Sequence, residues 1–226
     1  MADIEAHHRT NDIFLGPVER PALKWFAGRM PAWITPDILT AIGFIGALII
    51  FSGYWLSSYD RGFLWLASLG FVVNWFGDSM DGTLARYRSI QRPRYGFFLD
   101  HTVDTFSEVV IFIGLGLSPF VQFNIAMLAL TGYLLMSVLV FVRTCVDNEF
   151  KISFGRLGPT EVRLIAVASN TIVFFTAKSR IVLPFGNYSV FDLIGILIIV
   201  LLFGFFIGST ILQARELASV DEVKQN

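Results

Sequence analysis

Four aspartates form two pairs in a stretch of the chain that is otherwise apolar. Asp78 and Asp81 are three residues apart, and Asp100 and Asp104 are four residues apart. On α-helices, residues at either spacing share one face, so each pair can act on one ligand. If a short loop joins the two helices, they are antiparallel neighbours and all four carboxylates converge at one end of the hairpin. Ligands that are all oxygens favour Mg²⁺ or Mn²⁺ over zinc.

The free energy of burying these acids in a membrane also indicates bound cations. One acidic side chain at the centre of a membrane helix costs roughly 2.5–3.5 kcal/mol, so four would cost about 10–14 kcal/mol before their mutual repulsion. Neither helical segment contains a Lys or Arg to neutralise them, which leaves external cations or retained protons. Two metal ions roughly 3.5–4 Å apart would suit phosphoryl chemistry, because they neutralise a diphosphate and stabilise the attacking and leaving oxygens.

Small residues and one arginine accompany the acids. Gly82 and Ala85 leave room on the first of the two helices for a nucleotide to approach the backbone, and Gly96 does so at the start of the second. Arg86 offers a fork of donors suited to phosphate. Glycine also serves helix packing in membranes, which is the alternative reading of each glycine taken singly.

The composition is that of an integral membrane protein. Of the 226 residues, 54% are apolar and 15% are charged, whereas a soluble domain is about 25% charged. The net charge of −1 argues against a nucleic-acid-binding protein. A membrane-spanning helix needs roughly 20 mostly apolar residues. We expect an all-α membrane protein with six transmembrane helices, at about 36–57, 62–82, 97–117, 121–142, 160–177 and 189–212.

Residues 19–30 are expected to form an amphipathic helix on the membrane surface. Pro21 suits a first helical turn, and apolar residues alternate with Lys24 and Arg29. A soluble amphipathic helix is the alternative. The preceding residues are polar and mixed in charge, so we do not expect a cleaved signal peptide. The only cysteine, Cys145, cannot form an intramolecular disulfide.

The distribution of basic residues predicts the orientation in the membrane. They gather in the N-terminal segment, in the loops after the second and fourth spans and in the C-terminal tail, whereas the opposite loops hold only Arg61, Lys178 and Arg180. The positive-inside rule then places both termini and the acids on the cytoplasmic side. The predicted division is a cytoplasmic N-terminal segment with the amphipathic helix (1–34), a six-helix catalytic membrane domain (35–213) and a cytoplasmic tail (214–226).

One pattern joins these residues into a motif. The run Asp78-x₂-Asp81-Gly82-x₂-Ala85-Arg86-x₉-Gly96-x₃-Asp100-x₃-Asp104 resembles the full signature of the CDP-alcohol phosphotransferase family. The resemblance implies an integral-membrane enzyme of phospholipid synthesis. Such an enzyme transfers a phosphate-linked group from a CDP-activated donor to an alcohol, releases CMP, uses two Mg²⁺ or Mn²⁺ ions and is often a homodimer.

The resemblance also assigns roles within the motif. Asp78, Asp81 and Asp100 would be metal ligands, and Asp104 would be the general base for the acceptor hydroxyl, a metal ligand, or both. The CDP moiety would be bound by Gly82, Ala85, Arg86 and Gly96. Thr35-Pro36-Asp37, with Leu39 and Thr40, resembles the start of the family's first span, with Asp37 where Asn is usual, so a nucleotide contact there is in doubt.

Five polar residues that are not among the motif's defined positions are further candidates. His101 is either a proton acceptor, as in the choline/ethanolamine branch of the family, or a structural hydrogen-bonding residue. Glu108 either orients Asp104 or packs in protonated form. Thr160 is expected to cap a helix, and the nearby Arg156 and Arg163 either bind a phosphate of donor or acceptor or serve only topology.

The identity of the substrates stays open, and so does one other class of protein. The donor is either CDP-diacylglycerol, with a small polar alcohol as acceptor, or a CDP-amino alcohol, with a diglyceride as acceptor; His101 favours the second arrangement. A divalent-cation transporter is the alternative, but transporters often place their sites near the midplane within internal repeats, and the sequence shows neither feature.

Overall fold

The computed structural model describes residues 15–147, 159–176, 180–183 and 186–225. Arg156 therefore lies outside the described residues. Seven helices account for most of this part of the chain: α1 (Gly16–Ala27), α2 (Pro36–Leu56), α3 (Phe63–Tyr87), α4 (Pro93–Leu117), α5 (Phe123–Asp147), α6 (Pro159–Thr176) and α7 (Val190–Gln225). A short antiparallel hairpin, β1 (Arg180–Leu183) with β2 (Gly186–Ser189), joins α6 to α7 and is a departure from the purely helical prediction.

The helices from α2 to α7 coincide with the six apolar segments of the sequence. Three of them are long and apolar enough to cross a membrane, over Pro36–Leu56, Phe123–Val146 and Val190–Ser219. The other three, α3, α4 and α6, contain the charged residues of the acidic region, which lowers their hydropathy. The chain is thus a mostly helical membrane protein. The last helix continues past residue 213, so the predicted start of a separate tail falls inside α7.

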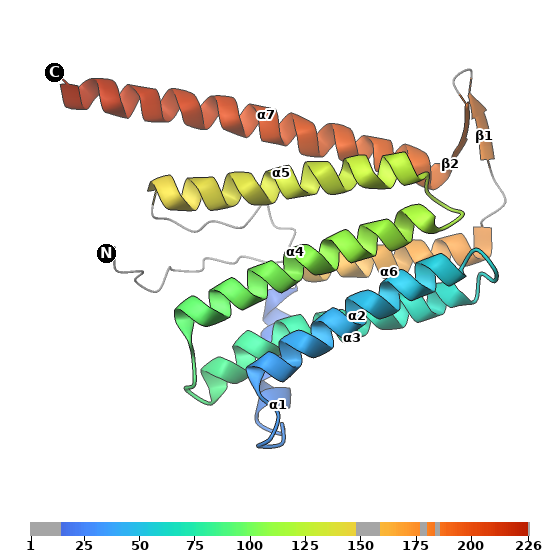
Figure 1. The fold of residues 1–226 in the computed structure, drawn as a ribbon, viewed down its shortest axis with the longest axis horizontal. Coiled ribbons are helices and arrows are strands. Elements are labelled where there is room, and N and C mark those ends of the chain that lie inside the picture. The colour runs from blue at the N-terminus through green and yellow to red at the C-terminus, as the bar shows by residue number, and fades with distance from the viewer. Residues whose placement is uncertain (1–14, 148–158, 177–179, 184–185, 226) are drawn as a thin grey trace.

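The acid-bearing helices α3 and α4 both pack against α2. In the described structure, α2 packs against both α3 and α4, α6 packs on α3, and α5 lies between α4 and α7 (Figure 1). The short loop brings α3 and α4 to the same end of the bundle, where the side chains of Asp78 on α3 and of Asp100 and Asp104 on α4 meet. Most of the backbone contacts of both helices are made with α2.

Glycines allow the closest of these contacts, between α2 and α3. A Cβ atom added to Gly77 would lie 2.2 Å from the backbone nitrogen of Gly43, and one added to Gly46 would lie 2.4 Å from the nitrogen of Asn74. Small residues at such crossings let helix backbones approach each other in membranes. This contact fixes the position of α3 at the turn that carries Asp78.

Substitution of Gly77 by Ala should therefore destabilise the protein. The new methyl group would meet backbone atoms, which cannot rotate away, so we expect a cost of about 1–3 kcal/mol and a melting temperature in detergent lower by roughly 3–10 °C. Gly204→Ala is the matched control, because no heavy atom of the described structure lies within 4 Å of the added methyl group. A melting temperature of Gly77→Ala equal to that of Gly204→Ala would contradict the account of this contact.

The N-terminal helix α1 runs across the direction of the other helices (Figure 1). It begins at Gly16, earlier than predicted, because Pro17 occupies the first turn and Glu161 accepts a hydrogen bond from the Leu15 amide. Pro21 consequently lies inside the helix and not in its first turn. The buried residues Leu23 and Ala27 of α1 share one apolar cluster with Met80 and Leu84 of α3.

Candidate active site

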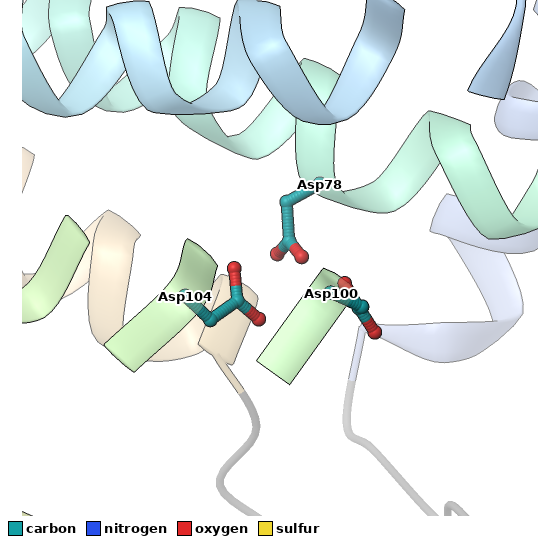
Figure 2. Close-up of side chains that lie close together, drawn as sticks. All are labelled: Asp78, Asp100 and Asp104. Atoms are coloured by element: carbon teal, nitrogen blue, oxygen red, sulfur yellow. The ribbon is translucent and has the colours of Figure 1, made fainter. Parts of the chain in front are cut away.

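Three of the four signature aspartates form a cluster between α3 and α4. One carboxylate oxygen each of Asp78, Asp100 and Asp104 lies within 4.8 Å of the others, and all three residues are partly buried. Asp78 points from α3 towards the two aspartates of α4 (Figure 2). Carboxylates held this close repel one another unless a cation lies among them, and an all-oxygen donor set matches Mg²⁺ or Mn²⁺. The residues present therefore fit a divalent metal site.

Asp81 faces a different partner. Its carboxylate accepts a hydrogen bond of 2.6 Å from the Thr40 hydroxyl of α2, and its side chain is buried. It is not a member of the cluster of three, although the charges of Asp78 and Asp100 act on it. The predicted convergence of all four carboxylates is thus seen for three of them. Thr40 belongs to the stretch at the start of the first predicted span that resembles the family's motif, but that resemblance did not indicate a contact with Asp81.

Arg163 of α6 forms an ion pair with Asp78, one of the three clustered aspartates. Its Nη2 donates to Asp78 Oδ2 at 2.6 Å, and its Nε donates to Asn74 Oδ1 at 2.9 Å. Asn74 in turn donates to the carbonyl oxygen of Gly43 on α2 at 2.9 Å. The expectation that external cations or protons alone neutralise the acids therefore needs correction, since one arginine contributes. Asn74 lies one helical turn before Asp78, and this i, i+4 spacing of polar residues in an apolar helix was a usable signal.

The acidic stripe of α4 extends to Glu108, one turn beyond Asp104. The Glu108 carboxyl group shares a hydrogen bond with the Tyr133 side chain of α5, and both groups are close enough to Arg163 to interact with its charge. Glu108 therefore has a structural partner in α5. This arrangement supports the packing reading of Glu108, while its place beside Asp104 keeps the orienting reading open.

His101 lies on the side of α4 that faces α5. Its ring stacks on Phe97 with centroids 4.2 Å apart and meets Phe141 of α5 edge-on at 5.6 Å. Its Nδ1 is 2.9 Å from the Phe97 carbonyl oxygen and 3.7 Å from Asp100 Oδ2. The ring helps to line an open apolar pocket of about 540 Å³ that is formed mainly by α4, with Phe141 from α5. These contacts favour a structural role for His101 over proton transfer.

The predicted CDP-binding residues lie at the end of the bundle that carries the acids. An added Cβ on Gly96 would meet no heavy atom of the described residues within 4 Å, whereas one on Gly82 would lie 3.2 Å from Arg86 Nη1. Arg86 is exposed and donates to Thr83 Oγ1 at 3.2 Å. Ala85 is partly buried in the same turn. Open space at Gly96 and a reachable guanidinium at Arg86 are compatible with a bound nucleotide.

The unusual Asp37 also has a partner. It forms an ion pair with Arg92, which directly precedes α4, so the pair links the first turn of α2 to the loop after α3. An Asn at position 37 would form a weaker, uncharged contact with Arg92. The departure from the usual residue is thus explained by a local contact in this chain.

Comparison with known families identifies the chain. A sequence profile described as CDP-alcohol phosphatidyltransferase matches residues 33–207, from the approach to α2 into α7. The chain belongs to this family. The match includes every residue of the aspartate signature, so the resemblance drawn from the motif is confirmed.

Individual relatives cover smaller parts of the chain. A phosphatidylinositol phosphate synthase of Cutibacterium acnes is 37% identical over 86 residues, which are 38% of this chain and 39% of the relative. An archaetidylinositol phosphate synthase of Pyrococcus horikoshii is 34% identical over 104 residues, 46% of this chain and 52% of the relative. Cholinephosphotransferase 1 of Danio rerio is 23% identical over 188 residues, 77% of this chain and 48% of the relative. The chain spans about half the length of the curated relatives it matches.

Arg163→Gln should change cation binding and turnover in opposite directions. The substitution removes a positive charge beside Asp78, so we expect Mn²⁺ to bind about tenfold more tightly. Turnover should nevertheless fall at least about tenfold, because a charged donor for phosphate is lost. Free Mn²⁺ measured by electron paramagnetic resonance and CMP release report the two effects. Arg61→Gln, at the other end of α3, is the control; weaker Mn²⁺ binding by Arg163→Gln would contradict the placement of its charge.

Proposed function

We propose that this protein is a metal-dependent CDP-alcohol phosphotransferase of phospholipid synthesis. The observation that carries the proposal is the cluster of Asp78, Asp100 and Asp104, whose carboxylate oxygens lie within 4.8 Å of one another inside the family signature. The family membership supplies the reaction class. The cluster provides the oxygen ligands for Mg²⁺ or Mn²⁺, and the resemblance implies that two such ions are bound.

Each residue has a place in the reaction. Asp78 and Asp100 would hold the metals, with Asp81 joining from its position beside Thr40, and bound metals would neutralise the diphosphate of the donor. Gly82, Ala85, Arg86 and Gly96 would bind the CDP moiety. The acceptor oxygen attacks the phosphorus that carries the transferred group, the bond to the bridging oxygen breaks, and CMP leaves. Asp104 would take the hydroxyl proton, because an alcohol is a weak nucleophile until it is deprotonated.

Two pairs of substrates are considered: CDP-diacylglycerol with a small polar alcohol, and a CDP-amino alcohol with a diglyceride. The first pair has more support. Relatives named phosphatidylinositol phosphate synthase and archaetidylinositol phosphate synthase are 37% identical over 86 residues and 34% identical over 104 residues. They favour a CDP-linked lipid as donor and a small polar alcohol, itself bearing a phosphate, as acceptor. Arg163, with Arg156 outside the described residues, would bind that phosphate. The match to a cholinephosphotransferase and His101 beside Asp100 favour the second pair, a CDP-amino alcohol and a diglyceride.

The membrane arrangement is part of the proposal. We infer six spans from α2 to α7, with the amphipathic α1 on the membrane surface, where Trp25 and Phe26 are exposed. Both termini and the acidic cluster would face the cytoplasm, as the basic residues predict. The proposed parts remain the N-terminal segment 1–34, the catalytic domain 35–213 and the tail 214–226. A homodimer is expected by analogy with the family.

Purified protein assayed with Mg²⁺ tests the function. CDP-diacylglycerol, CDP-choline and CDP-ethanolamine would each be offered with a panel of polar alcohols, phosphorylated polyols and diacylglycerol, and CMP release would be measured. Metal-dependent CMP release with one pair supports the proposal and identifies the substrates. No release with any pair, together with Mn²⁺ uptake into proteoliposomes without a CDP compound, would instead support the cation transporter.

A further inference from the structure

One carboxylate outside the signature connects three helices at the acidic cluster. Glu19 of α1 accepts hydrogen bonds from Trp75 Nε1 at 2.7 Å, from the Ser79 hydroxyl at 3.2 Å and from the Thr160 hydroxyl at 2.9 Å. Two of the donors belong to α3 and the third to the first turn of α6. All three bonds end on the same oxygen, Oε1. Thr160 therefore serves this contact and is not the helix cap that the sequence predicted.

A reciprocal bond ties α6 back to α1. Glu161 is 7% exposed and accepts a hydrogen bond of 3.0 Å from the Leu15 amide, just before α1 begins. The neighbouring residues Thr160 and Glu161 thus contact the N-terminal helix at two points. Thr160 donates a hydrogen bond to Glu19, and Glu161 accepts one from the Leu15 amide. The first turn of α6 is fixed against α1 by these bonds, and α1 is fixed against α3 by Glu19.

The fixed turns are the ones that carry the polar residues of the site. Ser79 is adjacent to Asp78 on α3, and Arg163 lies three residues after Thr160 on α6. The 2.6 Å ion pair between Arg163 and Asp78 therefore closes a loop of contacts that runs from α6 through Glu19 to α3. Without the carboxylate at position 19, the first turn of α6 would keep the Glu161 bond to Leu15 but lose its link to α3. Arg163 would then be held at Asp78 by its own hydrogen bonds alone and would be free to shift.

We propose that Glu19 is a positioning residue that sets the place of Arg163 at the acidic cluster by bracing the start of α6 against α3. This inference rests on the proposed function in so far as Asp78 belongs to a cation site. Beyond that function, it adds that α1 influences the acidic cluster by setting the position of Arg163. A side chain displaced by about 1 Å from its productive position can cost about 100-fold in rate.

Substitutions at Glu19 and Thr160 separate this role from a general loosening of the fold. Glu19→Ala should lower CMP release about 10- to 100-fold and, like Arg163→Gln, tighten Mn²⁺ binding, here a few-fold, as the guanidinium moves away from Asp78. Glu19→Gln removes the same charge but keeps an oxygen at the acceptor position, so release should stay within about threefold of wild type. Thr160→Val removes one of the three donors to Glu19, so its CMP release should lie between those of Glu19→Ala and Glu19→Gln. Lys24→Ala truncates an exposed side chain of the same helix and is the control.

A double-mutant cycle provides the decisive comparison. In the Arg163→Gln background, Glu19→Ala should have no further effect on Mn²⁺ binding or CMP release, because interacting residues give non-additive effects. Multiplicative effects of the two substitutions would contradict the positioning role of Glu19. Weaker Mn²⁺ binding by Glu19→Ala, or a Glu19→Ala protein that behaves like Lys24→Ala, would contradict it as well. Wild type should bind Mn²⁺, and Asp78→Asn should abolish that binding. If either result fails, the proposed function is wrong, and not only the role of Glu19.

Discussion

Replacing Asp104 with Asn should nearly abolish CMP release while leaving donor binding almost unchanged. Asn has the same shape and can still accept a hydrogen bond, but it cannot take the proton of the acceptor hydroxyl. General-base catalysis contributes about 10²–10⁴-fold to rate, and we expect a loss of that size. Asp104 shares the cluster with Asp78 and Asp100, so in the proposed mechanism its carboxylate would lie beside the acceptor hydroxyl. Turnover and binding of a radiolabelled CDP donor would measure the two effects separately.

His101→Gln is the control for the assignment of the base. The ring of His101 packs against Phe97 and Phe141, so its removal should lower turnover by less than about tenfold through local packing alone. If Asp104→Asn keeps near-normal turnover and His101→Gln does not, His101 is the base and Asp104 is only a ligand. Loss of Mn²⁺ binding in Asp104→Asn would show that this carboxylate also holds metal.

Asp100→Asn should remove both cation binding and turnover. Substitutions of residues that only support a metal ligand already cost about 10–100-fold in affinity, so loss of a ligand should weaken Mn²⁺ binding at least about 100-fold. Turnover at ordinary metal concentrations should fall below detection. Mn²⁺ titration followed by electron paramagnetic resonance measures the affinity, and CMP release at rising Mg²⁺ tests whether excess metal restores the reaction.

Asp60→Asn provides the matched control for this substitution. Asp60 lies in the connection between α2 and α3, at the end of the bundle remote from the cluster, and its side chain accepts a hydrogen bond from the Gly62 amide. An Asn side chain can make the same bond, so both Mn²⁺ binding and turnover should match wild type. Wild-type Mn²⁺ affinity in Asp100→Asn would remove Asp100 from the metal site.

The positions of the helices followed from the sequence because long apolar runs have few alternatives in a membrane. Helices α2 to α7 lie where the apolar segments are, and the i, i+4 spacing did place Asp100 and Asp104 together, whereas Asp81, three residues after Asp78, lies outside the cluster. The boundary of α1 was less accurate, since its start depends on Glu161, a residue remote in sequence. A contact across 146 residues leaves no local pattern.

The partners of the acids were beyond what spacing along one helix can reveal. Arg163 reaches Asp78 from α6, and Thr40 reaches Asp81 from α2, so both contacts depend on how helices pack. Helix α2 packs against both α3 and α4 and so helps to place the two acid-bearing helices. The close approach of α2 to α3 at Gly43 and Gly77 decides this arrangement, and glycines in membrane helices are too common to indicate which pair will meet.

A count of bound metal ions tests the central claim most directly. Purified protein would be titrated with Mn²⁺ in the presence of a CDP-linked donor, and bound ions would be counted by electron paramagnetic resonance in wild type and in Asp78→Asn. The account predicts two bound ions per chain with mutually coupled spins, and their loss in Asp78→Asn. A wild-type protein that binds no Mn²⁺, or binds it equally well after Asp78 is replaced, would contradict the account.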